Sequence, residues 1–241
     1  MSGARARQLT ITFPSRRAHG RADFLVTPAN EHAAAFVLAL ERWPGGRLAL
    51  TGPDGSGKTH LAHALMAERS ARLIDAAGLR PDGVEELAAA PAAVVEDVDR
   101  LGDLSTDEAR QAEAGVFHLF NLAAAGQARL LVTGREAPAR WRIRTPDLAS
   151  RLQSLTVAKI SAPDDALLSS LVVKHGHERR LDFDADAAAF VASRVERSFA
   201  GVAQAVAQID AAASLRKRRH VTLSLASAAL RDAAATESTE E

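Results

Sequence analysis

An eight-residue phosphate-binding pattern, Gly-x-x-x-x-Gly-Lys-Ser/Thr, is matched in full by Gly52–Thr59. It constrains the fold more than any other feature, because such a loop joins the end of a strand to the start of a helix. The apolar stretch Leu48–Leu50 precedes the loop, and Leu61 and Leu65 share one face of the helix predicted after it. The glycines allow a tight turn whose N–H groups point at phosphate oxygens, and the helix amino terminus also favours an anion. This context disfavours the alternative of a glycine-rich turn with a solvated lysine.

Two side chains of the loop have clear expected roles. Lys58 is long enough to reach the β- and γ-phosphates of a nucleotide, and the Thr59 hydroxyl is placed to bind Mg²⁺. The candidate nucleotide-binding residues in and after the loop are Gly52, Pro53, Asp54, Gly55, Ser56, Gly57, Lys58, Thr59 and His60.

The composition limits the kinds of protein this chain can be. Its 241 residues are 47% hydrophobic, enough for a nucleotide-binding domain and a second, smaller one. The formal net charge is zero, so DNA contact made by this chain alone is expected to be weak or indirect. Cysteine is absent, no apolar run approaches a membrane span, and the amino terminus has no apolar signal core. We therefore expect a cytoplasmic protein without disulfides or membrane contact.

Apolar strand patterns alternate with helical patterns over the first two thirds of the chain. Strands are predicted at 47–51, 72–75, 92–96, 129–133 and 155–159, and helices near 30–42, 58–69, 83–89, 106–125 and 145–152. Short apolar strands separated by helices predict an α/β fold with a five-stranded parallel sheet sandwiched by helices.

The character of the sequence changes after Lys159. Ser161–Asp164 is typical of a helix start, and the pattern beyond it is helical at about 163–178, 184–195, 198–216 and 223–232. We predict an arm at 1–20, a nucleotide-binding domain at 21–160, a small α-helical domain at 161–232 and a disordered tail at 233–241.

Carboxylates end the third predicted strand, Ala93–Asp97. Beside a phosphate loop, such a strand end holds Mg²⁺ and polarises water, so Glu96 is a candidate Mg²⁺ ligand and Asp97 a candidate catalytic residue. An acidic pair facing solvent is the alternative. Thr133 ends the next apolar strand and could lie near the γ-phosphate, although a threonine that closes a buried strand is common.

Arg151 projects beside the Leu148 and Leu152 stripe of a predicted helix. From there it could reach a nucleotide on a neighbouring subunit. By the residue pattern alone, a surface arginine is the simpler interpretation in so arginine-rich a chain.

The order of these motifs resembles the AAA+ ATPases, more closely their DnaA-related branch, and most closely the Hda-like members of that branch. The resemblance runs from about Gln8 to Leu230, and the matching stretches include 43–61, 94–97, 129–134, 145–152 and 197–210. It implies that Gly52–Thr59 is Walker A and that Glu96–Asp97 ends Walker B. It also implies that Thr133 is in the sensor 1 turn, that Arg151 is the arginine finger and that Arg197 is the sensor 2 arginine, which touches the phosphates from the lid.

The resemblance further implies that Asn30 and the residues around Phe24 hold the adenine. Two departures from the pattern stand out: Glu96 where the family has aspartate, and Arg135 where relatives carry an acidic residue. Both suggest a chain that binds nucleotide well and hydrolyses it poorly.

The amino-terminal arm contains Gln8–Phe13, which looks like a sliding-clamp binding peptide. The apolar side chains of Leu9, Ile11 and Phe13 would anchor in a pocket, while the Gln8 amide would bond at its rim. The same alternation also fits an ordinary edge strand.

The leading hypothesis is a DnaA-related regulator that binds ADP or ATP with Mg²⁺, binds the clamp, and supplies Arg151 to DnaA-bound ATP; a homodimer is possible. Its rivals are a self-sufficient AAA+ ATPase acting as helicase loader or DNA remodeller, and a small-molecule kinase. The basic run Arg216–His220 is interpreted as a solvated helix end in preference to a DNA contact.

Overall fold

The computed structural model describes Val26 and residues 30–237 of the chain. The proposed clamp peptide, with Gln8, Leu9, Ile11 and Phe13, lies outside the described residues, and so does Phe24. Within the described part, no helix combines the length and the apolar character needed to cross a membrane.

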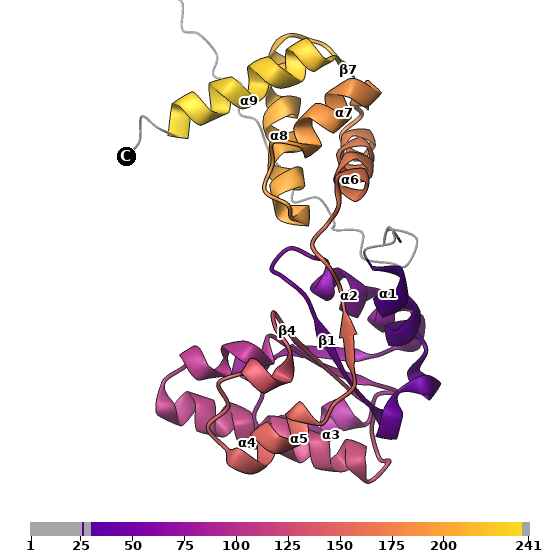
Figure 1. Ribbon diagram of the computed structural model, residues 1–241, viewed down its shortest axis with the longest axis vertical. Coiled ribbons are helices and arrows are strands. Elements are labelled where there is room, and N and C mark those ends of the chain that lie inside the picture. Colours follow the sequence, from indigo (N-terminus) through magenta and orange to yellow (C-terminus); the bar gives the residue numbers. More distant parts are fainter. Residues whose placement is uncertain (1–25, 27–29, 238–241) are drawn as a thin grey trace, which may run out of the picture.

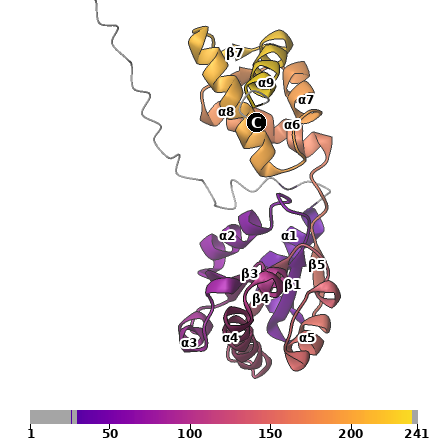
Figure 2. The same ribbon diagram turned by 90° about the vertical axis from the view of Figure 1, so that its left-hand side faces the viewer.

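A five-stranded parallel sheet forms the centre of the larger unit (Figures 1 and 2). Its order is β2-β3-β4-β1-β5, so the phosphate-loop strand β1 lies between β4 and β5. The strands are β1 Arg47–Thr51, β2 Arg72–Asp75, β3 Ala93–Glu96, β4 Leu130–Gly134 and β5 Val157–Lys159. The sequence therefore predicted this fold class correctly.

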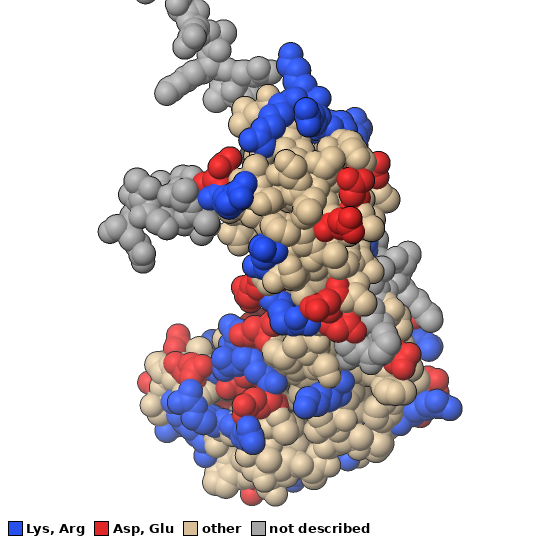
Figure 3. All heavy atoms as spheres, turned by 45° about the horizontal axis from the view of Figure 1, so that its top comes forward, with Lys and Arg blue, Asp and Glu red and all other residues tan. Residues whose placement is uncertain are grey.

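Helices cover both faces of the sheet. On the face of this unit that Figure 3 shows, charges of both signs are intermixed. The helices are α1 Glu31–Leu38, α2 Lys58–Arg69, α3 Val84–Ala88, α4 Thr106–Ala124 and α5 Pro146–Gln153. Helices α1 and α2 share one hydrophobic core with the sheet, and α3, α4 and α5 share the other.

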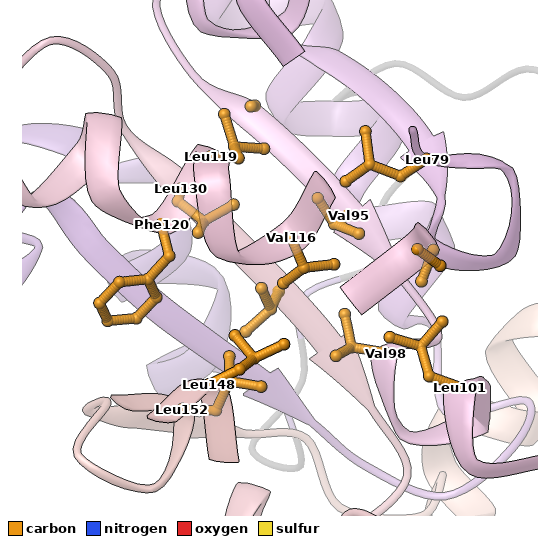
Figure 4. Close-up of a cluster of buried hydrophobic side chains, with 14 of the residues drawn as sticks. Leu79, Val95, Val98, Leu101, Val116, Leu119, Phe120, Leu130, Leu148 and Leu152 are labelled. Carbon is orange, nitrogen blue, oxygen red and sulfur yellow. The ribbon is translucent and has the colours of Figure 1, made fainter. Parts of the chain in front are cut away.

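The two cores arise from the alternation of side chains along each strand. In β4, Leu130 and Val132 face the α3–α5 side, and Leu131 faces the α1–α2 side. Figure 4 shows the core on the α3–α5 side, where leucines of α4 and α5 meet the strand residues. A sheet buried on both faces is fixed in register, so the strand ends are placed reproducibly.

The second unit is a helical lid with a hydrophobic core of its own. It comprises α6 Asp165–Glu178, α7 Ala185–Ala192, α8 Phe199–Leu215 and α9 Leu223–Glu237, and a two-stranded parallel sheet of β6 Asp182–Phe183 and β7 His220–Val221. In Figure 1 the lid stands above the carboxyl ends of β1 and β4. The chain reaches it through residues 160–164, directly after β5.

The structure departs from the sequence prediction in two places in the lid. The small β6–β7 sheet was not predicted, because two-residue strands are too short to show a periodicity. Helix α9 continues to Glu237, whereas the tail was predicted to be disordered from 233. The alanine-rich stretch 233–235 has high helix propensity, which explains the extension.

Candidate functional site

The predicted phosphate loop connects β1 to α2 as the sequence pattern requires. Gly55 and Gly57 adopt left-handed backbone angles, with φ of 69° and 99°. Helix α2 begins at Lys58, so its amino terminus opens on the loop. The Lys58 Nζ donates hydrogen bonds to the carbonyl oxygens of Gly52 at 2.7 Å and Pro53 at 3.0 Å.

Lys58 is buried, with 6% of its surface exposed. Burial lowers its pKa, and the carboxylates of Asp54, Asp97 and Asp99 oppose that shift. A cation in this position favours an anionic ligand, since a phosphate would replace the solvation that burial removes. The Ser56 hydroxyl oxygen is also buried in the loop and has no hydrogen-bond partner among the described residues.

The structure brings together the two predicted Mg²⁺ ligands. Burial raises the pKa of Glu96, and the Thr59 side chain lies close enough to the Glu96 carboxyl group to lower that pKa by less. The Oε1 atom of Glu96 is buried and lacks a hydrogen-bond partner within the described part of the chain. A hydroxyl and an under-coordinated carboxylate next to a phosphate loop fit a Mg²⁺ ion bound together with a nucleotide.

Asp97 directly follows β3 in the left-handed region, with φ of 56°. Its N–H donates a hydrogen bond of 3.1 Å to the hydroxyl of Thr133, which is fully buried on the neighbouring β4. Burial raises the pKa of Asp97, and Arg100 lowers it. The predicted sensor residue Thr133 therefore lies beside the strand-end carboxylates and supports the backbone of one of them.

Two arginines complete this cluster. The sequence pattern predicted no partner for either of them. Arg100 bridges the Asp54 carboxylate at 3.3 Å and the Asp97 carboxylate at 3.4 Å. Arg135 donates a 2.6 Å hydrogen bond from Nε to Asp99, whose side chain is 7% exposed. The unusual position of Arg135 was visible in the sequence, but its partner was not, because ion pairs 36 residues apart leave no local pattern.

The lid touches the phosphate loop through the amino terminus of α8. The Phe199 N–H donates a 3.2 Å hydrogen bond to the Gly55 carbonyl, and the Phe199 ring packs edge-on against His60 with centroids 5.9 Å apart. Any Cβ at Gly55 would lie 2.1 Å from the Ser198 Cβ, and one at Gly57 would lie 3.1 Å from the Phe199 ring. Glycine is thus required in the loop both for its backbone angles and for this contact.

Arg197 precedes the residues that touch the loop. Its guanidinium donates to the Pro163 carbonyl at 2.9 and 3.2 Å and pairs with Asp165 at 2.7 Å. In this arrangement it is held at the start of the lid, one residue away from the loop contact at Ser198. Contact between Arg197 and phosphate remains a prediction.

Asn30 is 2% exposed and directly precedes α1, so this predicted adenine residue lies inside the α/β unit. Its role towards adenine stays a prediction.

Arg151 is exposed in the last turn of α5. Its guanidinium lies 5.0 Å from the ring centre of Phe117 and 5.9 Å from that of Phe120, and it donates a 3.1 Å hydrogen bond to the Asn121 side chain. These three partners belong to α4, so the arginine lies on the outer surface between α4 and α5.

Glu113, which the sequence gave no reason to select, fixes the start of α5. This carboxylate of α4 is 1% exposed and accepts hydrogen bonds from the N–H groups of Arg144 and Thr145, both at 2.8 Å. The Thr145 hydroxyl donates a third bond of 2.6 Å. A carboxylate among apolar helical neighbours is the only signal that could have indicated it.

Comparison with protein-family models gives no match for the chain. Among solved structures, domain III of the Thermotoga maritima replication initiation protein DnaA is similar with a TM-score of 0.70 and 20% identity, over 91% of this chain and 98% of that one. Replication initiator DnaA bound to AMPPCP and single-stranded DNA has a TM-score of 0.63 and 19% identity, over 79% of this chain and 64% of that one.

The Thermotoga maritima RuvB Holliday junction branch migration motor has a TM-score of 0.67 and 15% identity, over 89% of this chain and 72% of that one. The chain spans about 64% of the length of the longer initiator chains that it matches. These similarities show the fold: a parallel sheet with flanking helices and a helical lid, as in the AAA+ P-loop NTPases.

Proposed function

We propose that this chain is a nucleotide-binding AAA+ regulator of replication initiation of the Hda type. It binds ADP or ATP with Mg²⁺ at Gly52–Thr59 and Glu96, binds the sliding clamp through its arm, and supplies Arg151 to ATP held by DnaA. The similarity of fold to DnaA and the order of the sequence motifs support the proposal. The position of Arg151 is the single observation that carries it.

That position suits a residue that acts on another subunit. The strands are parallel, the phosphate loop follows the carboxyl end of β1, and α5 ends at Gln153, shortly before the chain enters β5. Arg151 therefore lies near the amino ends of the strands, about 15 Å or more from its own phosphate loop. The Arg151 guanidinium is exposed and cannot reach its own nucleotide. Its contacts with Phe117 and Asn121 hold it at the surface, where it is available to a partner's nucleotide.

The chain's own nucleotide has a binding role in this proposal. Lys58 and the loop N–H groups hold the phosphates, and a Mg²⁺ ion bound by Thr59 and Glu96 would neutralise phosphate charge. Arg100 pairs with Asp97, so the carboxylate that would polarise water is already engaged by a cation. Slow hydrolysis by the chain itself follows from this pairing and from the longer side chain of Glu96.

The arm supplies recruitment in this proposal. Gln8, Leu9, Ile11 and Phe13 combine a hydrogen-bonding amide with three apolar anchors, which fits a short extended peptide bound in a pocket of the clamp. Recruitment to the clamp on DNA would place Arg151 close to DnaA assembled nearby.

The test mixes the chain with clamp loaded on DNA and with ATP-charged DnaA, and follows γ-phosphate release. The wild-type chain should stimulate hydrolysis, and Arg151→Ala should remove the stimulation, since arginine fingers contribute about 10³ to 10⁵ in rate. Arg140→Ala is the matched control, because Arg140 is also exposed and, among the described residues, forms an ion pair with Glu136 alone. Clamp binding should be equal in all three chains; undiminished stimulation by Arg151→Ala would reject the assignment.

The same assay separates this function from that of a self-sufficient helicase loader or DNA remodeller. Such an ATPase would turn over ATP without DnaA and would respond to DNA directly. Slow turnover by the isolated chain with DNA, together with strong stimulation of DnaA, supports the regulator.

A further inference from the structure

The lid helices α6 and α8 end side by side, and both end in the same hydrogen-bonding motif. Helix α6 closes with Arg180 in the left-handed region at φ 61°, where Leu181 N–H bonds the Gly176 carbonyl at 2.8 Å and Arg180 N–H bonds His177 at 2.9 Å. This double hydrogen bond is the Schellman motif.

Helix α8 closes on the same motif. Lys217 has φ of 50°, Arg218 N–H bonds the Ala213 carbonyl at 2.9 Å, and Lys217 N–H bonds Ser214 at 3.1 Å. Strands β6 and β7, which follow the two ends, pair through Asp182 N–H and the Arg219 carbonyl at 2.8 Å. Both helix ends therefore form one corner at the end of the lid far from the α/β unit (Figure 1).

The left-handed position of a Schellman motif is usually glycine, because a Cβ is strained there. Here both positions carry long cations, Arg180 and Lys217. Cations near a helix carboxyl terminus are favoured by the helix dipole, but Arg179 and Arg216 already provide one at each end. Helix capping alone therefore does not account for a cation at either strained position.

We call the exposed cations of these two ends the basic corner: Arg179, Arg180, Arg216, Lys217, Arg218 and Arg219. Asp210 pairs with Arg179 at 3.5 Å and with Arg219 at 3.6 Å, and Asp232 lies 4.0 Å from Arg216. His220 lies 3.4 Å from Asp182 and 3.2 Å from Asp184.

Within the described part of the chain, the other three cations of the corner have no carboxylate partner. Those residues are Arg180, Lys217 and Arg218. Figure 3 shows basic side chains gathered at this end of the lid, although the chain as a whole has no net charge.

We propose that the basic corner binds the phosphate backbone of double-stranded DNA, without reading its sequence. Several separate cations on an exposed surface fit successive backbone phosphates. Phe183, the aromatic residue of β6, is buried at 8% exposure, so it provides no platform for stacking single-stranded bases. Leu215 and Leu223 are exposed next to the corner, but two leucines are a small apolar face for a membrane surface.

The sequence alone favoured a solvated helix end. It could not show that residues 179–180 lie beside residues 216–219, because that depends on the β6–β7 pairing.

The test measures binding of the full chain to fluorescent 25-base-pair duplexes of two unrelated sequences, by anisotropy over a range of salt concentrations. The double variant Arg180→Gly with Lys217→Gly removes two charges at positions that suit glycine. Its affinity for both duplexes should fall at least about tenfold at 0.1 M salt, and the slope of log affinity against log salt should decrease by about 2. Its thermal midpoint should stay the same or rise, since strain at two caps is relieved.

The arm makes a matched control necessary, because residues 1–25 contain five arginines. Arg42→Gln with Arg110→Gln removes two exposed cations of the α/β unit and should leave binding unchanged. Exchanging the cations, Arg180→Lys with Lys217→Arg, should restore most of the affinity that the glycine variant loses.

Four results would overturn the proposal: no duplex binding by the wild-type chain, equal binding by the glycine variant, an equal loss in the control, or a lower thermal midpoint of the glycine variant that tracks its loss of binding. Vesicles containing phosphatidylglycerol form a separate arm. Binding to vesicles but not to duplex would assign the corner to a lipid surface and reject the DNA proposal.

Discussion

The α/β unit and the lid differ in what they bury. Of the eight buried polar or charged residues in the described part of the chain, seven belong to the α/β unit and one, Ser198, belongs to the lid. Ser198 is also a lid residue that touches the phosphate loop. Because burying polar groups is costly unless they are satisfied, they concentrate where a structure needs them for chemistry or for a fixed joint. The lid has an apolar core, and it contacts the phosphate loop through Ser198 and Phe199.

The two units also keep separate hydrophobic cores. Every buried member of the lid core comes from residue 167 onward, and the two cores of the α/β unit end at Ile160. A lid that shares no core with the sheet can change its angle while its own packing stays intact. The predictions that follow test this separation, from the largest expected effect to the smallest.

The largest effects should come from equal deletions in the two cores. Leu168→Ala in the lid and Leu148→Ala in the α/β unit each remove a fully buried leucine and should cost about 3 kcal/mol of unfolding free energy. Calorimetry should show that each variant lowers the transition of its own unit. One transition that moves equally in both variants would contradict the separation.

Lys58→Ala should weaken nucleotide binding about 100-fold, because a charge-assisted contact to phosphate in a buried site is lost. Titration with a fluorescent ADP analogue measures it. Lys174→Ala in the lid is the matched lysine and should bind as the wild type does. Equal affinity of Lys58→Ala and the wild type would place the nucleotide elsewhere.

Gly55→Ala should disrupt the contact between the phosphate loop and the lid. The new Cβ would meet Ser198, and φ of 69° would strain an alanine, so we expect a loss of about 2 kcal/mol in stability. The lid should also become more susceptible to proteolysis at residues 160–164. Gly78→Ala is the control, since a Cβ there meets nothing within 4 Å. Equal proteolysis of the two variants would show that the lid does not depend on this contact.

The smallest effect should come from the start of α4, where Ser105 and Glu108 form a capping box. Ser105→Ala should cost about 1 kcal/mol. Hydrogen bonds from Ser105 lower the pKa of Glu108, so the part of the stabilisation that needs the ionised carboxylate is present above the ordinary carboxyl range and is lost as pH falls through the lowered pKa. Urea unfolding at pH 7 and at pH 3 measures both. A Ser105→Ala cost that is the same at the two pH values would contradict a contribution of the ionised Glu108 carboxylate to this cap.

The sequence predicted the elements of the fold well because each leaves a local pattern. The apolar runs that became β1, β3 and β4 are flanked by turns, and the Gly52–Thr59 pattern fixes its own loop. It also selected Glu96 and Thr59, which do meet.

What the sequence could not give are contacts between distant segments. The Arg135 and Asp99 pair, the bridge made by Arg100, and the docking of Phe199 on the loop all depend on how strands and lid are placed in space. Propensity and periodicity describe single segments and carry no information about such pairs.

The buried carboxylate of Glu113 ties α4 firmly to the start of α5. Three hydrogen bonds converge on it, so the loss of any one would leave a buried acceptor less well satisfied. We therefore expect this junction to resist bending and the two helices to move as one rigid piece. A partner that docks against α4 would steer the guanidinium at the far end of α5 without touching it.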